Sequence, residues 1–314
     1  AGLLVVVAAR PVAIGQGGQP ATPLTADDLL KVTTATVLDV SDDGRRVAYT
    51  TRRPLDNATT DHRRYGDPTY IAPAAVRLFS VDTGTGASTP VLPALADIRQ
   101  AAWSHAGTHL AFLQLQPGGS ATDPVVRLRV WDAGRGTLRD VALTGGARIA
   151  VNSGLAWSPD DTRLVLALRT TARDDEARKR FKALTDGPII VHSSKDPFLE
   201  WDDLGRTARW RALAEVDLAT GQPRTVLPER KLSSYTVARD GTFITFQEDV
   251  TAKTDYETIG GTDNALRMVQ TGGGDPVTIA EAKDLKGLTL RWSDDGRLFF
   301  ALSYDDFERE SSAP

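Results

Sequence analysis

The sequence contains no cysteine and only four histidines among its 314 residues. Without cysteine there is no disulfide framework, no thiolate-ligated zinc and no thiol nucleophile. A basic excess is also absent, because 37 Lys and Arg residues stand against 41 Asp and Glu residues, a net charge of -4. This balance argues against nucleic acid as a partner. The sequence therefore predicts a soluble globular protein, without nucleic acid, cofactor or metal, that acts through its fold and its loops.

The first nine residues form an apolar run that is too short to span a bilayer. Arg10, Pro11 and a segment rich in Gly, Gln and Pro follow. The run resembles the apolar part of a secretory signal, with a small-residue cleavage pattern at Ala13–Gly15. We therefore expect residues 1–23 to be a signal-peptide remnant and flexible lead-in, and the protein to be exported, periplasmic or secreted, without stable membrane insertion. A buried first strand is the alternative.

Five segments share an apolar strand, a tight polar turn and a second apolar strand, as in LDVSDDGRRVAYT. Asp supplies side-chain hydrogen bonds and Gly the positive φ that a tight hairpin turn needs, and the flanks are β-branched or aromatic. Each segment is predicted to be a β-hairpin. The five hairpins begin at Leu38, Ala101, Leu155, Tyr235 and Leu290.

A second pattern, Asp followed four residues later by Gly, lies between consecutive copies of the first. One repeat then consists of two hairpins, or four antiparallel strands, which is the composition of a propeller blade. We predict an all-β propeller over residues 24–314, incomplete in this chain, with four blades and the first hairpin of a fifth. The second turns begin at Asp82, Asp132, Asp217 and Gln270, where Gln replaces Asp.

The lengths of the connections differ in one place only. The distance from a second turn to the next first turn is nearly constant, whereas the distance between the two turns of one repeat varies widely. The insertions therefore lie between the second and third strands of the blades. In an up-and-down blade these connections lie on the face opposite the tight turns, so we expect the functional surface on that face.

Two segments have helical signals. Thr25 and Asp28 have the spacing of a capping box before the first blade. In the largest insertion, 171–209, Ala177, Phe181 and Leu184 follow at helical spacing.

The second part of this insertion combines aromatic and acidic residues. Glu200, Trp201, Asp202 and Asp203 are our candidate substrate-binding residues, since an acidic, aromatic-backed edge pairs with a cation such as a free amino terminus. The alternative is a solvent-exposed insertion without a binding role, whose aromatic residues pack on the blade.

No catalytic residue is predicted. Ser88 and Ser120 lie nearest to a Gly-x-Ser-x-Gly pattern, but both lack the closing Gly. His105 and His109 are four residues apart, yet they lie at a hairpin turn and not on a helix face, which disfavours a metal site. The aspartates of the first turns are too few for a calcium loop, and turn chemistry explains them better.

The segment LTADDLLKVTTATVLDVSDDGRRVAYT from Leu24, followed by W-S-P-D-D hairpins and V-D-L-A-T-G turns, resembles the N-terminal β-propeller of exported bacterial serine peptidases of the prolyl oligopeptidase family. Dipeptidyl-peptidase-like and acylaminoacyl-peptidase-like members belong to this group. The resemblance extends from Leu24 to Asp306. It implies a C-terminal α/β-hydrolase domain with a Ser-Asp-His triad, which this chain does not contain, and a non-catalytic propeller that controls the access of short peptides.

Three hypotheses remain open at this point. The chain is the gating propeller of a serine peptidase, with a peptide substrate and the hydrolase domain of the parent chain as partners, or it is a freestanding periplasmic propeller that binds proteins, similar to Tol-system propellers. The third is an enzyme with a site in the propeller itself. An oligomer is compatible with each of them. Under the first hypothesis the sequence is a fragment of a longer product, in which the apolar residues at Phe299, Phe300 and Leu302 would be covered by further strands.

Overall fold

The computed structural model describes residues 25–58, 71–72, 74–116, 125–186, 195, 198, 200–253, 262–285, 288–292 and 299–303, the last two ranges by their backbone alone. The predicted signal-peptide remnant, His62, His192 and Ser120 lie outside these residues. Among the helices that are described, none combines the length and the apolar character needed to cross a bilayer.

The chain begins with α1 (Ala26–Lys31), whose N-terminus has the predicted capping box. The backbone N–H of Asp28 donates to the Thr25 hydroxyl at 3.3 Å, and the Thr25 N–H donates to the Asp28 carboxylate at 3.0 Å. Two of the otherwise unsatisfied donors at the helix start are thus paired.

Most of the remaining regular structure consists of β-strands, which form four blades and a further hairpin. Blade 1 consists of β1 (Thr34–Val40), β2 (Arg46–Arg52), β3 (Ala75–Asp82) and β4 (Ser88–Pro90), with the short helix η1 (Pro54–Asn57) after β2. Blade 2 consists of β5 (Ala96–Trp103), β6 (His109–Gln116), β7 (Val125–Asp132) and β8 (Thr137–Val141). The pairs within each blade are antiparallel, and a two-residue pairing of β3 with β5 joins the two blades into one sheet.

Blades 3 and 4 form a second sheet. Blade 3 consists of β9 (Arg148–Ile149), β10 (Leu155–Trp157), β11 (Arg163–Arg169), β12 (Trp210–Asp217) and the first part of β13 (Pro223–Val237). Blade 4 consists of the second part of β13, β14 (Phe243–Asp249), β15 (Asn264–Gln270) and β16 (Val277–Ala280). The helices α2 (Thr171–Thr185) and α3 (Glu200–Thr207) lie in the insertion, and α4 (Ala282–Leu285) precedes the last hairpin, β17 (Leu288–Trp292) and β18 (Phe299–Ser303).

The strand β13 passes from blade 3 to blade 4 without a loop. It pairs with β12 as far as Lys231 and with β14 from Leu232 onward. The β12 pairing shifts its register between Arg211 and Leu213, opposite Pro228, which has no N–H to donate to the ladder. A proline at a bulge is tolerated because the ladder is already interrupted there.

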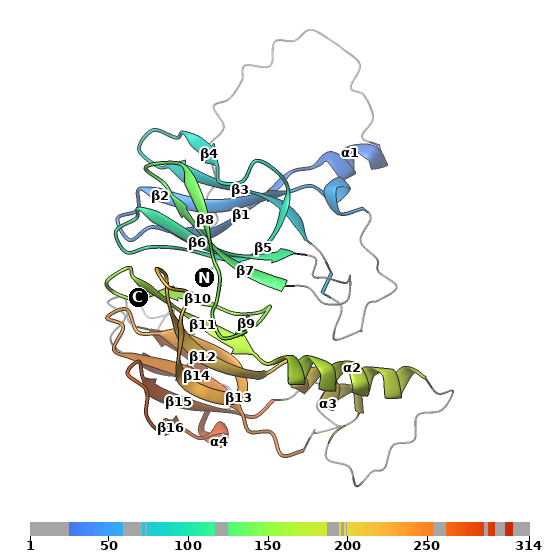
Figure 1. Ribbon diagram of the computed structural model, residues 1–314. Coiled ribbons are helices and arrows are strands. Elements are labelled where there is room, and N and C mark those ends of the chain that lie inside the picture. The colour runs from blue at the N-terminus through green and yellow to red at the C-terminus, as the bar shows by residue number, and fades with distance from the viewer. Residues whose placement is uncertain are drawn as a thin grey trace, which may run out of the picture.

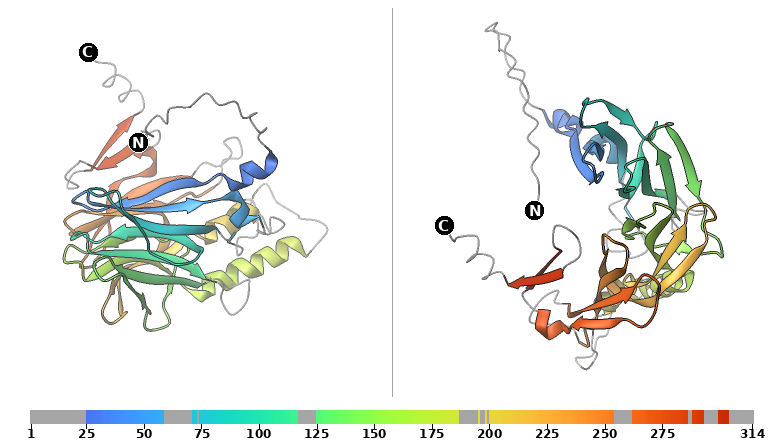
Figure 2. Two further views of the ribbon diagram at one scale, coloured as in Figure 1. Left: turned by 90° about the horizontal axis from the view of Figure 1, so that it is seen from above. Right: turned by 90° about the vertical axis from the view of Figure 1, so that its left-hand side faces the viewer.

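The blades stand side by side around a common axis and form an open arc (Figure 2). Seen from the side, the tight turns lie at one end of the blades, and α1, α2 and α3 lie at the other (Figure 1). We call these the turn end and the connection end. The all-β propeller with four blades and a further hairpin is thus confirmed, as is the separation of the tight turns from the inserted helices.

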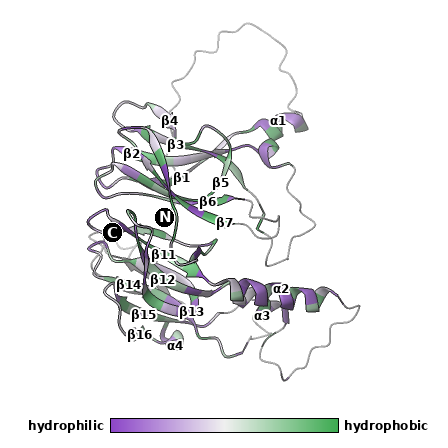
Figure 3. Ribbon diagram, in the orientation of Figure 1, coloured by the Kyte–Doolittle hydropathy of each residue, from purple (hydrophilic) through white to green (hydrophobic). Residues whose placement is uncertain are grey.

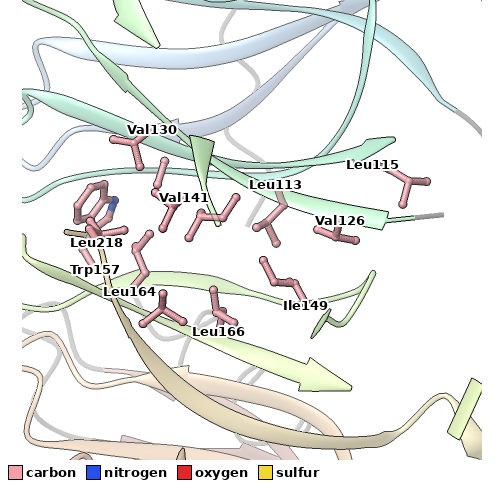
Figure 4. Packing of buried hydrophobic residues seen from close by; sticks show 13 residues of the cluster. Leu113, Leu115, Val126, Val130, Val141, Ile149, Trp157, Leu164, Leu166 and Leu218 are labelled. Atoms are coloured by element: carbon pink, nitrogen blue, oxygen red, sulfur yellow. The ribbon is translucent and has the colours of Figure 1, made fainter. Parts of the chain in front are cut away.

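The core consists of layers between neighbouring blades. In β11, Leu164 and Leu166 face blade 2, whereas Val165 and Ala167 face blade 4, as the two-residue period of a strand requires. The layer between blades 2 and 3 brings Leu113, Val130 and Val141 against Leu164, Leu166 and Trp157 (Figure 4). Apolar residues accordingly occupy the strands, whereas α2 is mostly hydrophilic (Figure 3). Blades 2 and 3 are therefore held between apolar neighbours on both faces.

Candidate functional site

The first turns at the turn end are closed by their own side chains. Asp43 accepts a hydrogen bond from the Ser41 hydroxyl at 2.7 Å, and Asp160 accepts one from Ser158 at 2.6 Å. These hydrogen bonds are the main reason why the pKa of each carboxyl lies below its ordinary value. The interpretation of these aspartates as turn residues is confirmed.

The second turns use the same chemistry with backbone donors. Asp82, Asp132 and Asp217 each accept a hydrogen bond from the N–H three residues on, at 2.8, 3.0 and 2.8 Å. These backbone hydrogen bonds lower the pKa of all three carboxyls. The acidic side chains of the second turns therefore serve the fold and not a ligand.

A small cavity of about 180 Å³ lies where the innermost strands reach the turn end. Beside it, His105 Nδ1 lies 2.9 Å and Arg239 Nη2 lies 3.7 Å from Asp42 Oδ2, so that one carboxylate connects blades 1, 2 and 4. His109 instead contacts Thr108 at 2.9 Å and Asp132 at 4.0 Å. The two histidines thus have separate partners, and within the described ranges no three metal-ligating side chains converge.

Asp161 links blade 3 to blade 2 at the turn end through two hydrogen bonds. Its φ of 55° is left-handed, at the position that glycine holds in the other three first turns that the structure describes. Its carboxylate oxygens accept hydrogen bonds from the backbone N–H groups of His105 and Ala106 at 2.8 and 2.9 Å. Aspartate adopts this conformation more readily than most residues, and the two bonds between the blades offset the remaining strain.

At the connection end, the insertion folds into two packed helices. Ala177, Leu184 and Leu204 are buried against one another, with Phe181 beside them, so the predicted helical spacing is confirmed by α2. The insertion is fixed to blade 4 through Asp249, whose side chain is fully buried. Arg206 and Arg209 each donate to its Oδ2 at 2.6 Å.

The four predicted substrate-binding residues lie in the first turn of α3. Glu200, Trp201 and Asp202 are exposed, and Trp201 packs edge-on against Phe181 with ring centroids 6.0 Å apart. Asp203 is half-buried and forms an ion pair with Arg180 of α2. The structure thus brings these residues together on one helix, but they are not among the described residues that line the larger cavity of this end.

That cavity measures about 590 Å³ and lies between blades 2 and 3. The segment 142–152, which links the two blades, forms one wall. The start of β7, the end of β11, the start of β12 and the inner side of α2 form the others. Most of these positions are at the connection end, but the link 142–152 begins nearer the turn end, where the Thr144 N–H donates to the Gly221 carbonyl of a second turn at 3.0 Å. The volume is typical of pockets for small molecules.

Arginines outnumber carboxylates among the residues that line the cavity. Its two acidic residues are already paired, because Asp174 binds Arg169 at 2.5 Å and Asp140 binds Arg129 at 2.7 Å. The chain as a whole is acidic, with a net charge of -4. The cavity therefore has the opposite sign to the molecule around it. Six arginines line it: Arg99, Arg127, Arg148, Arg169, Arg178 and Arg211.

Arg211 is half-buried at the start of β12, beside the register shift opposite Pro228. Its hydrogen bonds go to two carbonyl oxygens, those of Ala208 at 3.2 Å and Asn152 at 3.0 Å. Burial is the main cause that lowers the pKa of its guanidinium, and the positive charges of Arg169 and Arg209 lower it further, against an opposing effect of Tyr235. An anion beside Arg211 would be stabilised by this surplus of positive potential.

The strand order and the radial arrangement define a β-propeller. No protein-family model matches the sequence, and no curated protein matches it. Among solved structures, acylaminoacyl peptidase from Pyrococcus horikoshii is similar at 12% identity and a TM-score of 0.50, covering 85% of this chain and 35% of that one. At this identity the similarity shows a shared fold.

Two further structures overlap with most of the chain. One is an oligogalacturonate lyase in complex with manganese, at 15% identity and a TM-score of 0.49, covering 86% of this chain and 62% of that one. The other is the β-propeller domain of the Trilobed protease from Pyrococcus furiosus, at 11% identity and a TM-score of 0.48, covering 85% and 62%. The chain thus spans less than two thirds of each of the three structures.

Sequence reasoning missed the arginine-lined cavity. Its charged residues come from β5, β7, β8, β9, β11, α2 and β12, so no short motif contains them. The available signal was weak: an arginine recurs where a strand enters or leaves the connection end, as at Arg99, Arg169 and Arg211. Strand pairing in blade 3 and packing between blades 2 and 3 bring these positions together.

Proposed function

We propose that this chain is the non-catalytic propeller portion of an exported serine peptidase of the prolyl oligopeptidase family. In this role it limits access to a Ser-Asp-His triad that lies outside these 314 residues, in an α/β-hydrolase domain. Short peptides reach the triad past the connection end, and larger substrates are held away by the blades and by the insertion that contains α2 and α3.

One observation carries this proposal: the connection end combines the inserted helices with a cavity of about 590 Å³. The turn end has a cavity of only about 180 Å³, and the aspartates of its turns are hydrogen-bonded within those turns. A rigid scaffold with variable connections at one end is typical of a recognition surface. Asp249 fixes the insertion to blade 4, so the insertion has a defined position from which to restrict entry.

Two further features are compatible with a peptidase propeller. The lead-in before the first blade resembles that of the peptidase family, and an acylaminoacyl peptidase shares the fold at a TM-score of 0.50. Export is part of the proposal, because the apolar start of the sequence resembles a secretory signal.

The test uses the complete product of the parent gene. We expect a fluorophosphonate probe to label one serine downstream of the propeller, within a Gly-x-Ser-x-Gly pattern, and the protein to hydrolyse short peptides but not folded proteins. Replacing residues 171–209 by a short Gly-Ser turn should leave the labelling intact and admit longer peptides. A control variant, Asp175→Ala on the exposed face of α2, should keep the original size limit.

The freestanding scaffold predicts the opposite result. Under that hypothesis the complete product is not labelled by the probe and retains a folded protein partner instead. Absence of labelling together with absence of peptide hydrolysis would overturn the proposal.

A further inference from the structure

The cavity between blades 2 and 3 has two chemically different parts. Towards the blades its surface is apolar, formed by Val126, Leu128, Val141 and Ile149, which belong to the inter-blade core. In Figure 4, Val126 and Ile149 face each other across the gap between the blades. Towards the connection end the lining is rich in arginine. A ligand that fits both parts has an apolar group close to an anionic group.

Four of the six lining arginines form ion pairs with carboxylates, and two of these carboxylates, Asp97 and Asp175, do not line the cavity. Asp174 pairs with Arg169, which also donates to the Thr207 carbonyl at 2.8 Å. Asp140 is shared between Arg129 at 2.7 Å and Arg127 at 3.4 Å. Arg211, in contrast, forms no ion pair among the described residues, and its hydrogen bonds go to carbonyl oxygens of two different segments.

Arg99 adds a second, independent observation. Its Nη2 donates to Asp97 at 2.6 Å and to the Ala72 carbonyl at 3.0 Å. Its Nε is buried and has no hydrogen-bond partner among the described residues, and the same is true of Asp97 Oδ1 in this ion pair. A buried charged donor without a partner is costly, and an acceptor in the cavity would remove that cost.

We propose that this cavity binds the free carboxylate of a short peptide, with Arg211 as the main contact and the adjacent apolar wall holding the last side chain. A guanidinium presents two parallel donors to a carboxylate, so Arg suits this role better than Lys. The inference rests on the proposed function, since it names the part of a peptide substrate that the propeller recognises.

The experiment compares two peptides that differ in this one group. Binding of N-acetyl-alanyl-leucine and of its C-terminal amide to the full chain is measured by calorimetry at low ionic strength. We expect the acid to bind about 10- to 100-fold more tightly than the amide, the range for a hydrogen bond to a charged group. Inorganic phosphate at the same concentration should bind more weakly than the acid, because it lacks the apolar group.

Variants assign the effect to the cavity. Arg211→Gln should abolish the difference between acid and amide, and Arg211→Lys should retain part of it because the charge remains. Arg139→Gln is the matched control: Arg139 also lies at the boundary of blades 2 and 3 and donates to a carbonyl, that of Leu218 at 2.8 Å, but it does not line the cavity. The control should bind the acid as the wild type does.

Equal binding of acid and amide, unchanged acid binding by a folded Arg211→Gln variant, or phosphate binding as tight as that of the acid would overturn the inference. Serine labelling of the complete product is independent of this result. If the serine is labelled but acid and amide bind equally, the carboxylate site is wrong and the peptidase proposal stands. If the acid binds more tightly than the amide but no serine is labelled, the carboxylate site stands and the peptidase proposal is wrong.

Discussion

The aspartates that close the tight turns and the charged residues that fix the insertion at the connection end are paired in different ways. At the turn end, aspartates such as Asp43, Asp82 and Asp160 accept hydrogen bonds from residues of their own turn, within five positions in the sequence. At the connection end, charged residues meet partners from distant segments, as Arg206 and Arg209 meet Asp249. Arginines outnumber carboxylates around the cavity there. A carboxylate that is hydrogen-bonded within its own turn stabilises that turn. Where several arginines from distant segments meet, the positive electrostatic potential can attract an anionic ligand.

The largest effect is expected at Asp249, which joins the insertion to blade 4. Asp249→Ala leaves two arginines without their carboxylate, and Arg206 is almost fully buried. Breaking a buried pair in this way costs about 3–5 kcal/mol. The free energy of unfolding, from urea titration of the full chain, checks this value.

The matched control lies on the surface of the same insertion. Asp175 pairs with Arg178 at 2.6 Å, but its side chain is 69% exposed. Asp175→Ala should change the free energy of unfolding by about 0.5 kcal/mol or less. Similar losses for the two variants would show that Asp249 does not anchor the insertion.

The second effect concerns a close approach at the turn end. Gly221 has a φ of 71°, and a Cβ there would overlap the Ala142 carbonyl oxygen of the inter-blade link. Gly221→Ala should therefore cost about 3 kcal/mol, combining left-handed strain with overpacking. Gly86 holds the same φ in blade 1 with open space around it. Gly86→Ala should cost about 1 kcal/mol.

Thermal unfolding of both glycine variants measures the difference. Equal shifts in Tm would mean that the backbone conformation alone accounts for Gly221, and that the inter-blade link is not packed against this turn.

The smallest effect is a difference in pH dependence between two aspartates of blade 1. Burial raises the pKa of Asp39, whose Oδ2 accepts a hydrogen bond from the backbone N–H of Trp103 at 2.6 Å. The pKa of Asp43 is lowered, chiefly by Ser41. A raised pKa in the folded state favours folding at acid pH, and a lowered one favours folding above the ordinary pKa. Between pH 6 and pH 3, Asp39→Asn should lose more stability than the wild type and Asp43→Asn less.

Urea titrations at four pH values within this range check the two slopes. Parallel curves for the two variants would mean that the carboxylates do not differ in their folded environments.

The repeats in the sequence were sufficient to predict the blades, because each hairpin combines a two-residue apolar period with a local turn signal. The turn at Ser41 and the helix around Ala177 are determined by neighbours in the sequence, and both were predicted. The continuous passage of β13 around Lys231 was not, because no turn residue marks it. The left-handed Asp161 was missed as well, since its carboxylate finds its donors in another blade.

The candidate site was harder to predict from the sequence, because residues that are distant in the sequence form it. Glu200 and its neighbours are adjacent in the sequence and were therefore noticed, and they lie together on α3. Arg169 and Arg211 are brought together by the pairing of β11 with β12 in blade 3, which places Leu168 opposite Ala212, and packing between blades 2 and 3 adds Arg99.

The most direct test of the contrast between the two ends is to locate a bound peptide by amide hydrogen exchange. The full chain is measured with and without N-acetyl-alanyl-leucine. The account predicts slower exchange in residues 142–152 and 208–211, which border the arginine-lined cavity. Slower exchange confined to the turns at 41–46 and 104–109, or no change in either region, would contradict it.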